Sequence, residues 1–86
     1  MKSFHPPIPI TVTENSDGRP VSFSYRKRME KVSLVRRRWS FSAYSEGWSK
    51  KEMLREYFLL ETLGGTTCEI YCDFPTRSWY LNTIFD

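Results

Sequence analysis

Residues 55–86, REYFLLETLGGTTCEIYCDFPTRSWYLNTIFD, decide the fold. In the middle of this stretch Cys68, Ile70 and Cys72 fall on one face of an extended strand, and polar or aromatic residues alternate with them on the other. A Gly-Gly pair precedes this segment and Pro-Thr-Arg follows it, and both are turn signals. The stretch therefore predicts three antiparallel strands joined by two short turns.

The segments that precede this stretch carry the same period of two. Asp17-Gly18 lies between two of them and is a hairpin-type turn signal. Alternation places Ile8, Ile10 and Val12 on one face of the first segment, and Val21, Phe23 and Tyr25 on one face of the second. We expect two further strands here.

The next segment, YRKRMEKVSLVRRRW at residues 25–39, changes parity along its length. Val32 and Leu34 share one parity, whereas Val35 and Trp39 share the other. An unbroken strand cannot place both pairs on one face, so the pattern predicts a β-bulge near residues 34–36. We expect a hairpin in which Tyr25, Val32, Leu34 and Trp39 anchor the core.

Residues 42–54 are the least strand-like part of the chain. Gly47 interrupts the pattern, and Ser49 followed by Glu52 has the spacing of a capping box, which opens helices. The sequence therefore predicts one short helix near residues 49–54.

Together these elements predict an all-β fold, or a β-rich α+β fold. We expect a small antiparallel SH3-like barrel of five to six strands, and a twisted sheet carrying one short helix is the alternative. Three prolines hold residues 1–7 extended, as an N-terminal arm or an edge strand. Residues 8–86 then form a single small β domain.

The charge is unevenly distributed along the chain. Residues 19–38 hold eight basic residues and one acidic residue, a balance of +7, whereas residues 39–86 hold four basic and seven acidic residues, a balance of −3. This layout fits a basic surface for nucleic acid or for an acidic partner. It fits equally well a pairing of the arginines with Glu56, Glu61, Glu69 and Asp73 on neighbouring strands.

The candidate nucleic-acid-binding residues come from the basic segment and the aromatic residues next to it. Guanidinium groups suit bidentate phosphate contacts, and interleaved rings suit base stacking. The candidates are Arg26, Lys27, Arg28, Lys31, Arg36, Arg37, Arg38, Trp39 and Tyr44.

Enzymatic chemistry has little support in the sequence. It contains no glycine-rich phosphate loop, nucleophile elbow or metal-binding histidine pair, and His5 is the only histidine. In a strand Cys68 and Cys72 lie roughly 13 Å apart, which is too far for a disulfide. We expect free thiols, no catalysis, no cofactor and no metal. With neither a signal peptide nor a long apolar run, we expect a cytoplasmic protein without membrane contact.

The chain resembles a small bacterial domain of uncharacterised function, which occurs alone and at the C-terminus of inactive Y-family polymerase-like mutagenesis proteins. The resemblance covers roughly residues 8–86. Lys27 stands where that domain usually has glycine, and Cys72 where it usually has arginine. The matching positions are Phe23, Arg26, Arg28, Val32, Trp39, Arg55, Tyr57, Glu69, Tyr71, Asp73, Trp79, Tyr80 and Leu81. The resemblance implies an accessory role in DNA transactions or damage tolerance, with DNA, RNA or a replication or repair protein as partner.

Two hypotheses follow for the function. The first is a non-enzymatic binding module whose basic hairpin contacts nucleic acid. The alternative is a protein-interaction module without nucleic-acid contact, which uses an aromatic groove or the strand edge near Ile8 to Val12. The sequence leaves the oligomeric state open, including a homo-oligomeric structural role.

Overall fold

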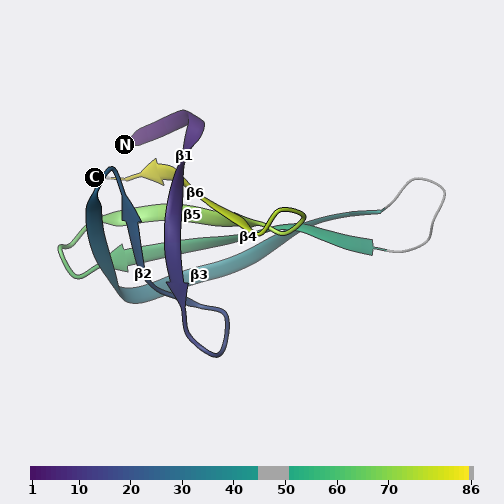
Figure 1. Ribbon diagram of the computed structural model, residues 1–86, viewed down its shortest axis with the longest axis horizontal. Helices are drawn as coiled ribbons and strands as arrows, with labels where there is room; N and C mark the ends of the chain where they lie inside the picture. Colours follow the sequence, from purple (N-terminus) through teal and green to yellow (C-terminus); the bar gives the residue numbers. More distant parts are fainter. Residues whose placement is uncertain (45–50, 86) are drawn as a thin grey trace.

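A computed structural model of the chain describes residues 1–44 and 51–85, with only the backbone at residues 44, 51 and 52. It contains six antiparallel strands in one sheet (Figure 1). Each strand pairs with the next, and the first also pairs with the last, so the sheet closes into a small barrel. The strands are β1 (Lys2–Glu14), β2 (Pro20–Tyr25), β3 (Arg28–Tyr44), β4 (Lys51–Thr62), β5 (Thr67–Asp73) and β6 (Ser78–Ile84).

Strand β1 closes the sheet by changing partner along its length. Lys2 to Ile10 run beside β6, and Thr11 to Glu14 run beside β2. Residues 2–7, for which an arm or edge strand was expected, therefore lie within β1, and Phe4 is buried. Figure 1 shows that this strand crosses in front of the sheet.

The turns form where the sequence predicts them, but the β2–β3 turn has no glycine at its left-handed positions. The first turn contains Gly18 at a φ of 75°, and the Oδ1 atom of Asn15 accepts hydrogen bonds from two backbone N–H groups in it. The β2–β3 turn has Arg26 at a φ of 48° and Lys27 at 66°, although neither residue is glycine. A two-residue turn of this type matches the twist of the strands that it joins only when both of its residues have positive φ, whichever residues they are.

The predicted bulge in β3 is present. The register between β3 and β4 shifts between Val32 and Leu34 and again between Val35 and Arg37. These two shifts allow Val32 and Val35 both to pack against the core. They also leave Leu34 on the outer surface, 49% exposed, so the expectation that it anchors the core was wrong.

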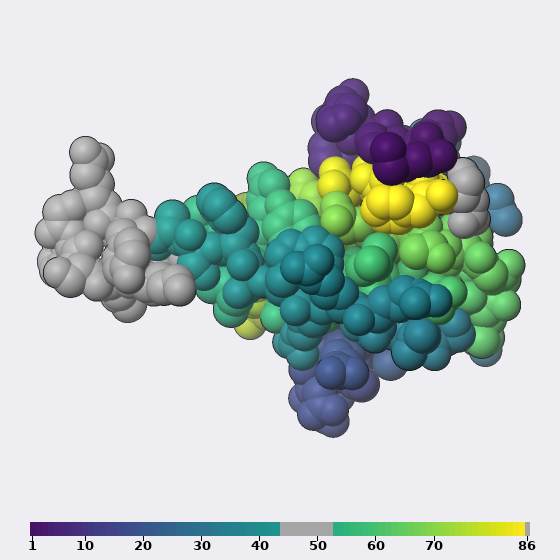
Figure 2. Space-filling view, turned by 180° about the vertical axis from the view of Figure 1, so that it is seen from behind, coloured from purple at the N-terminus to yellow at the C-terminus, as the bar shows by residue number. Residues whose placement is uncertain are grey.

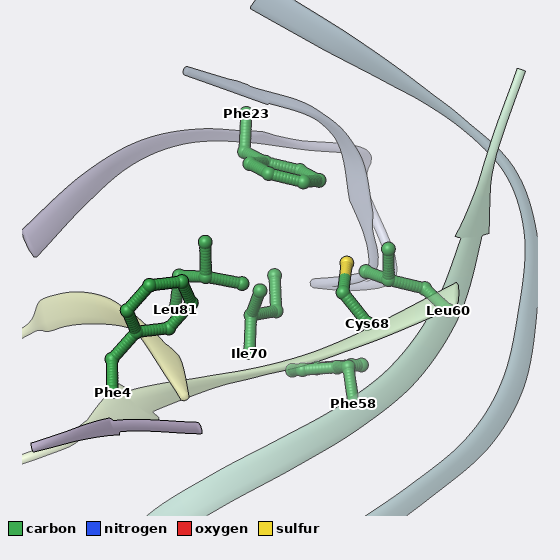
Figure 3. Close-up of a cluster of buried hydrophobic side chains, with 7 residues drawn as sticks. All are labelled: Phe4, Phe23, Phe58, Leu60, Cys68, Ile70 and Leu81. Carbon is green, nitrogen blue, oxygen red and sulfur yellow. The ribbon is translucent and has the colours of Figure 1, made fainter. Parts of the chain in front are cut away.

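Side chains from five strands meet inside the barrel (Figure 3). The buried cluster consists of Phe4, Phe23, Phe58, Leu60, Cys68, Ile70 and Leu81. Burying each large apolar side chain contributes roughly 1.5–3 kcal/mol, which makes this cluster the main source of stability. Cys68 and Cys72 are buried and form no disulfide, as predicted.

The predicted short helix was wrong over the residues that can be compared. Residues 51–54 belong to strand β4 and pair with β3, while Ser49 and residue 50 lie outside the described residues. The strand ladder overrode a local capping signal, because pairing with β3 supplies the backbone hydrogen bonds that a helix would otherwise supply.

Beyond the barrel, the β3–β4 hairpin continues as a two-stranded ribbon. Pairing of β4 with β5 starts at Arg55, so the residues of β4 before it have only β3 as a strand neighbour. Figure 1 and Figure 2 both show this hairpin projecting from the body of the molecule.

Candidate functional site

A row of four aromatic rings crosses the outer face of the sheet. Trp39 of β3 lies opposite Tyr57 of β4, Tyr57 opposite Tyr71 of β5, and Tyr71 opposite Tyr80 of β6. Tyr57, Tyr71 and Tyr80 occupy the outward positions of their strands, because each has a buried residue next to it in sequence. Trp39 lies on the same face because it pairs with Tyr57. We call these four residues the aromatic ladder.

The rings of the ladder stack on one another. The centroids of Trp39 and Tyr57 are 5.4 Å apart with an interplanar angle of 6°. The next two pairs have centroid distances of 5.2 and 5.3 Å. Tyr71, in the middle, is only 5% exposed although it points outward, and this burial raises the pKa of its hydroxyl. Neighbouring rings therefore cover much of each other's surface.

Two arginines lie on the ladder. The guanidinium carbon of Arg37 is 5.0 Å from the Trp39 ring centre, and that of Arg55 is 4.7 Å from the Tyr71 ring centre. Arg55 also donates a hydrogen bond from Nη1 to the Tyr57 hydroxyl at 3.3 Å, which raises the arginine pKa. Among the described residues, neither guanidinium has a carboxylate oxygen within 4.0 Å. Both charges are held by rings and remain available for an anion.

The neighbours of Arg37 on β3 are neutralised. Arg36 forms an ion pair with Glu61 at 3.0 Å. Arg38 donates two hydrogen bonds to Glu56, at 2.8 and 3.1 Å, and a third to the carbonyl of Asp17. The hydrogen bond to Glu56 is the main reason why the Arg38 pKa is raised. Arg38 thus fastens the β1–β2 turn to the barrel.

The second basic cluster lies at the β2–β3 turn. Arg26 lies over the ring of Phe4, with its guanidinium carbon 5.6 Å from the ring centre, and Arg28 is 3.9 Å from Glu30. Arg37 lies nine positions after Arg28 along β3, a path of roughly 30 Å at about 3.3 Å per residue. The two clusters therefore do not form one patch.

The structure divides the predicted site residues into five groups. Arg26, Lys27 and Arg28 lie at the β2–β3 turn, and Lys31 is exposed near the start of β3. Arg36 and Arg38 are paired with glutamates. Arg37 and Trp39 meet on the ladder, while the side chain of Tyr44 lies outside the described residues. Trp39 is therefore not the core anchor expected from sequence.

Arg55, Tyr57, Tyr71 and Tyr80 were not among the predicted site residues. The period of two had already placed Tyr71 on the face opposite the buried cysteines. The register that aligns it with Tyr57 and Tyr80 depends on turn geometry and bulges, so the alternation alone could not bring the three together.

Two small cavities lie apart from the ladder. One, of about 120 Å³, is lined by residues that include Arg28, Glu30 and Cys68, and the other, of about 130 Å³, by residues that include Arg38 and Cys72. Burial raises the pKa of the Cys72 thiol, which keeps it protonated and unreactive. Within residues 1–44 and 51–85, no three His, Cys, Asp or Glu side chains are placed to hold a metal ion.

Comparison with known proteins gave no match to a family model, to a curated protein or to a solved structure. The part of the chain that the structure describes has no helix of the length and apolarity needed to cross a membrane.

Proposed function

We propose that this domain is a non-enzymatic module that binds nucleic acid through the aromatic ladder and the arginines on it. The single observation that carries the proposal is the placement of Arg37 and Arg55 on ladder rings, without an ion pair among the described residues. Guanidinium groups bind phosphate oxygens in bidentate fashion, and stacking on a ring holds them in place at little entropic cost.

The ladder favours single strands over duplexes in this proposal. Adjacent rings stack on each other, so a bound base meets ring edges and tyrosine hydroxyls, with full stacking confined to the ends of the row. Affinity then comes mainly from phosphate contacts. Two such contacts, from Arg37 and Arg55, give a slope of about −1.4 for log K against log salt with a single strand.

The resemblance to the bacterial mutagenesis domain also supports a role in binding nucleic acid. It suggests an accessory role in DNA transactions or damage tolerance in the cytoplasm, with the basic ladder as the contact surface. We further propose that the closed six-stranded sheet belongs to the SH3-like class of small barrels, which commonly serve as binding modules.

Fluorescence anisotropy with labelled single- and double-stranded oligonucleotides tests the proposal. We expect the single strand to bind more tightly, and Arg37→Gln with Arg55→Gln to weaken binding and to bring the salt slope close to zero. Arg19→Gln, which removes one charge in the exposed β1–β2 turn, is the matched control for each single substitution and should leave both quantities nearly unchanged. Binding that is absent, or that responds equally to Arg19→Gln, contradicts the proposal.

A protein-interaction module is the second candidate, and one observation favours it. Beyond Arg38, which contacts the β1–β2 turn, β3 pairs with β4 and with no other described strand, so its second edge is open to strand addition there. The edge first expected to serve this role, near Ile8 to Val12, is partly used, since Ile8 and Ile10 pair with β6 and Val12 pairs with β2. Binding of a protein that survives the loss of Arg37 and Arg55 would favour this candidate.

A further inference from the structure

The amino-acid composition of the open β3 edge favours pairing with another β-strand. Residues 39–43, Trp-Ser-Phe-Ser-Ala, carry no charge, proline or glycine, and they precede a tyrosine. Phe41 is 55% exposed on one face of the ribbon, and Met53 is 45% exposed and lies opposite Ser42 on the other. An uncharged, aromatic, unpaired strand edge is the kind of edge that adds another strand.

The ribbon also lacks the strands that would stabilise it. Two-stranded ribbons are marginally stable in water, and three or more strands are needed for independent stability. Since β4 has no second strand neighbour before Arg55, the projecting ribbon gains most from a partner that supplies additional strands.

We propose that the β3 edge over residues 39–43 pairs antiparallel with the same edge of a second copy of this chain. A two-fold axis through Phe41 then joins two ribbons into a four-stranded sheet, with Trp39 opposite residue 43 of the other copy. Such an isologous contact is self-complementary, so it closes at two copies.

Charge is compatible with a second copy in this register and disfavours registers centred on the arginines. With the axis at Phe41, the two copies of Arg38 stand six residues apart along the paired strands, roughly 20 Å, which is about twice the screening length at 0.1 M salt. A register centred on Arg37 would instead place like charges directly opposite each other, which is destabilising. An acidic partner strand would meet no positive residue over 39–43, so charge gives it no advantage there.

This pairing does not depend on the proposed nucleic-acid function, but it determines where the two aromatic ladders of a dimer lie. When two strands pair antiparallel about a two-fold axis perpendicular to the sheet, the same face of each copy lies on the same side of the joint sheet. The outward face of Phe41 is also the face of the ladder, because Phe41 pairs with Arg55. The dimer therefore presents two ladders on one continuous surface.

Analytical ultracentrifugation over a wide range of protein concentrations tests the proposal. We expect the average mass to rise toward twice the 10.3 kDa of one chain, and Phe41→Lys to hold it at one chain. Leu34→Lys is the matched control, because Leu34 is similarly exposed on β3 but lies outside the proposed contact, and it should dimerise like the wild type. Circular dichroism checks that both variants stay folded.

A disulfide in a cysteine variant tests the register. Phe41→Cys places two thiols opposite each other across the axis, while Cys68 and Cys72 are buried and compete little. We expect rapid oxidation to a cross-linked dimer, and much slower cross-linking for Leu34→Cys. A chain that stays monomeric at every concentration, or a dimer that Phe41→Lys leaves intact, overturns the proposal. Failure here leaves oligonucleotide binding by the monomer unaffected, so the two proposals are tested separately.

Discussion

At the scale of single residues, the backbone of the β2–β3 turn is strained, and the alternation of apolar residues in the sequence does not reveal this strain. The strands on either side fix a turn that needs positive φ at Arg26 and Lys27, and neither residue adopts that conformation readily. The pairing of Tyr25 with Arg28 and the packing of Phe23 overcome this cost.

Lys27→Gly should therefore stabilise the domain. Glycine removes a left-handed strain of about 1–2 kcal/mol and adds an entropic cost of roughly 0.5–1 kcal/mol, so we expect a gain of about 0.5–1 kcal/mol. Urea unfolding measures it. The same substitution at Lys31, in regular paired strand, should lower stability by about 0.5–1 kcal/mol. If both variants are destabilised equally, the strain at Lys27 is not present.

The two ion pairs between β3 and β4 should also differ in energy. Arg38 and Glu56 have two hydrogen bonds between them and their side chains are 35% and 15% exposed, whereas Arg36 and Glu61 have a single contact nearer the surface. We expect Glu56→Ala to cost about 1–2 kcal/mol and Glu61→Ala at most about 0.5 kcal/mol. Equal losses in thermal unfolding would contradict this ranking.

At the scale of elements, the ladder depends on strand register. The sequence correctly predicted the alternation in β5, the β3 bulge and the turns, because these depend on neighbouring residues. It failed for residues 51–54, where pairing between strands overrode a capping pattern. At the end of β6, after a register shift between Glu69 and Ile70, Ile84 packs against the core and Phe85 is exposed.

The ladder should contribute to stability as well as to binding. Tyr57 stacks between Trp39 and Tyr71 and accepts a hydrogen bond from Arg55. Tyr57→Ala removes two ring contacts, each worth about 0.5–1.5 kcal/mol, so we expect a loss of roughly 1–3 kcal/mol in urea unfolding. Phe85→Ala, at a partly exposed ring outside the ladder, should cost less than about 1 kcal/mol. A smaller loss for Tyr57→Ala than for Phe85→Ala would show that the rings do not stack.

At the scale of the whole molecule, closure depends on β1. Its first half contributes Phe4 to the core and pairs with β6, so the proline-rich start of the chain is part of the fold. We expect Phe4→Ala to lower the free energy of unfolding by about 3 kcal/mol, as for other large core residues, and His5→Ala, at an exposed position, to lower it by less than about 0.5 kcal/mol. Similar effects of the two substitutions would mean that the barrel does not close through β1.

The barrel should lose stability in alkali. Burial raises the pKa of the Cys72 thiol above its ordinary value of 9.0 and that of the Tyr71 hydroxyl above 10.0. The unfolded chain then releases these protons first as the pH rises, which favours unfolding by up to about 1.4 kcal/mol per pH unit for each group. Urea unfolding from pH 8 to 11 should show this decline, and Cys72→Ala should make it shallower. An unchanged slope in the variant would exclude Cys72 as a cause.

In the proposed function, nucleic acid binds on the outer face of β3 to β6, at the ladder. NMR titration of the domain with a single-stranded oligonucleotide locates the binding surface. We predict that the largest chemical-shift changes fall on the Trp39 indole N–H and on the side-chain N–H groups of Arg37 and Arg55. Changes confined to Arg26–Arg28 at the β2–β3 turn, or no change at all, would contradict the account.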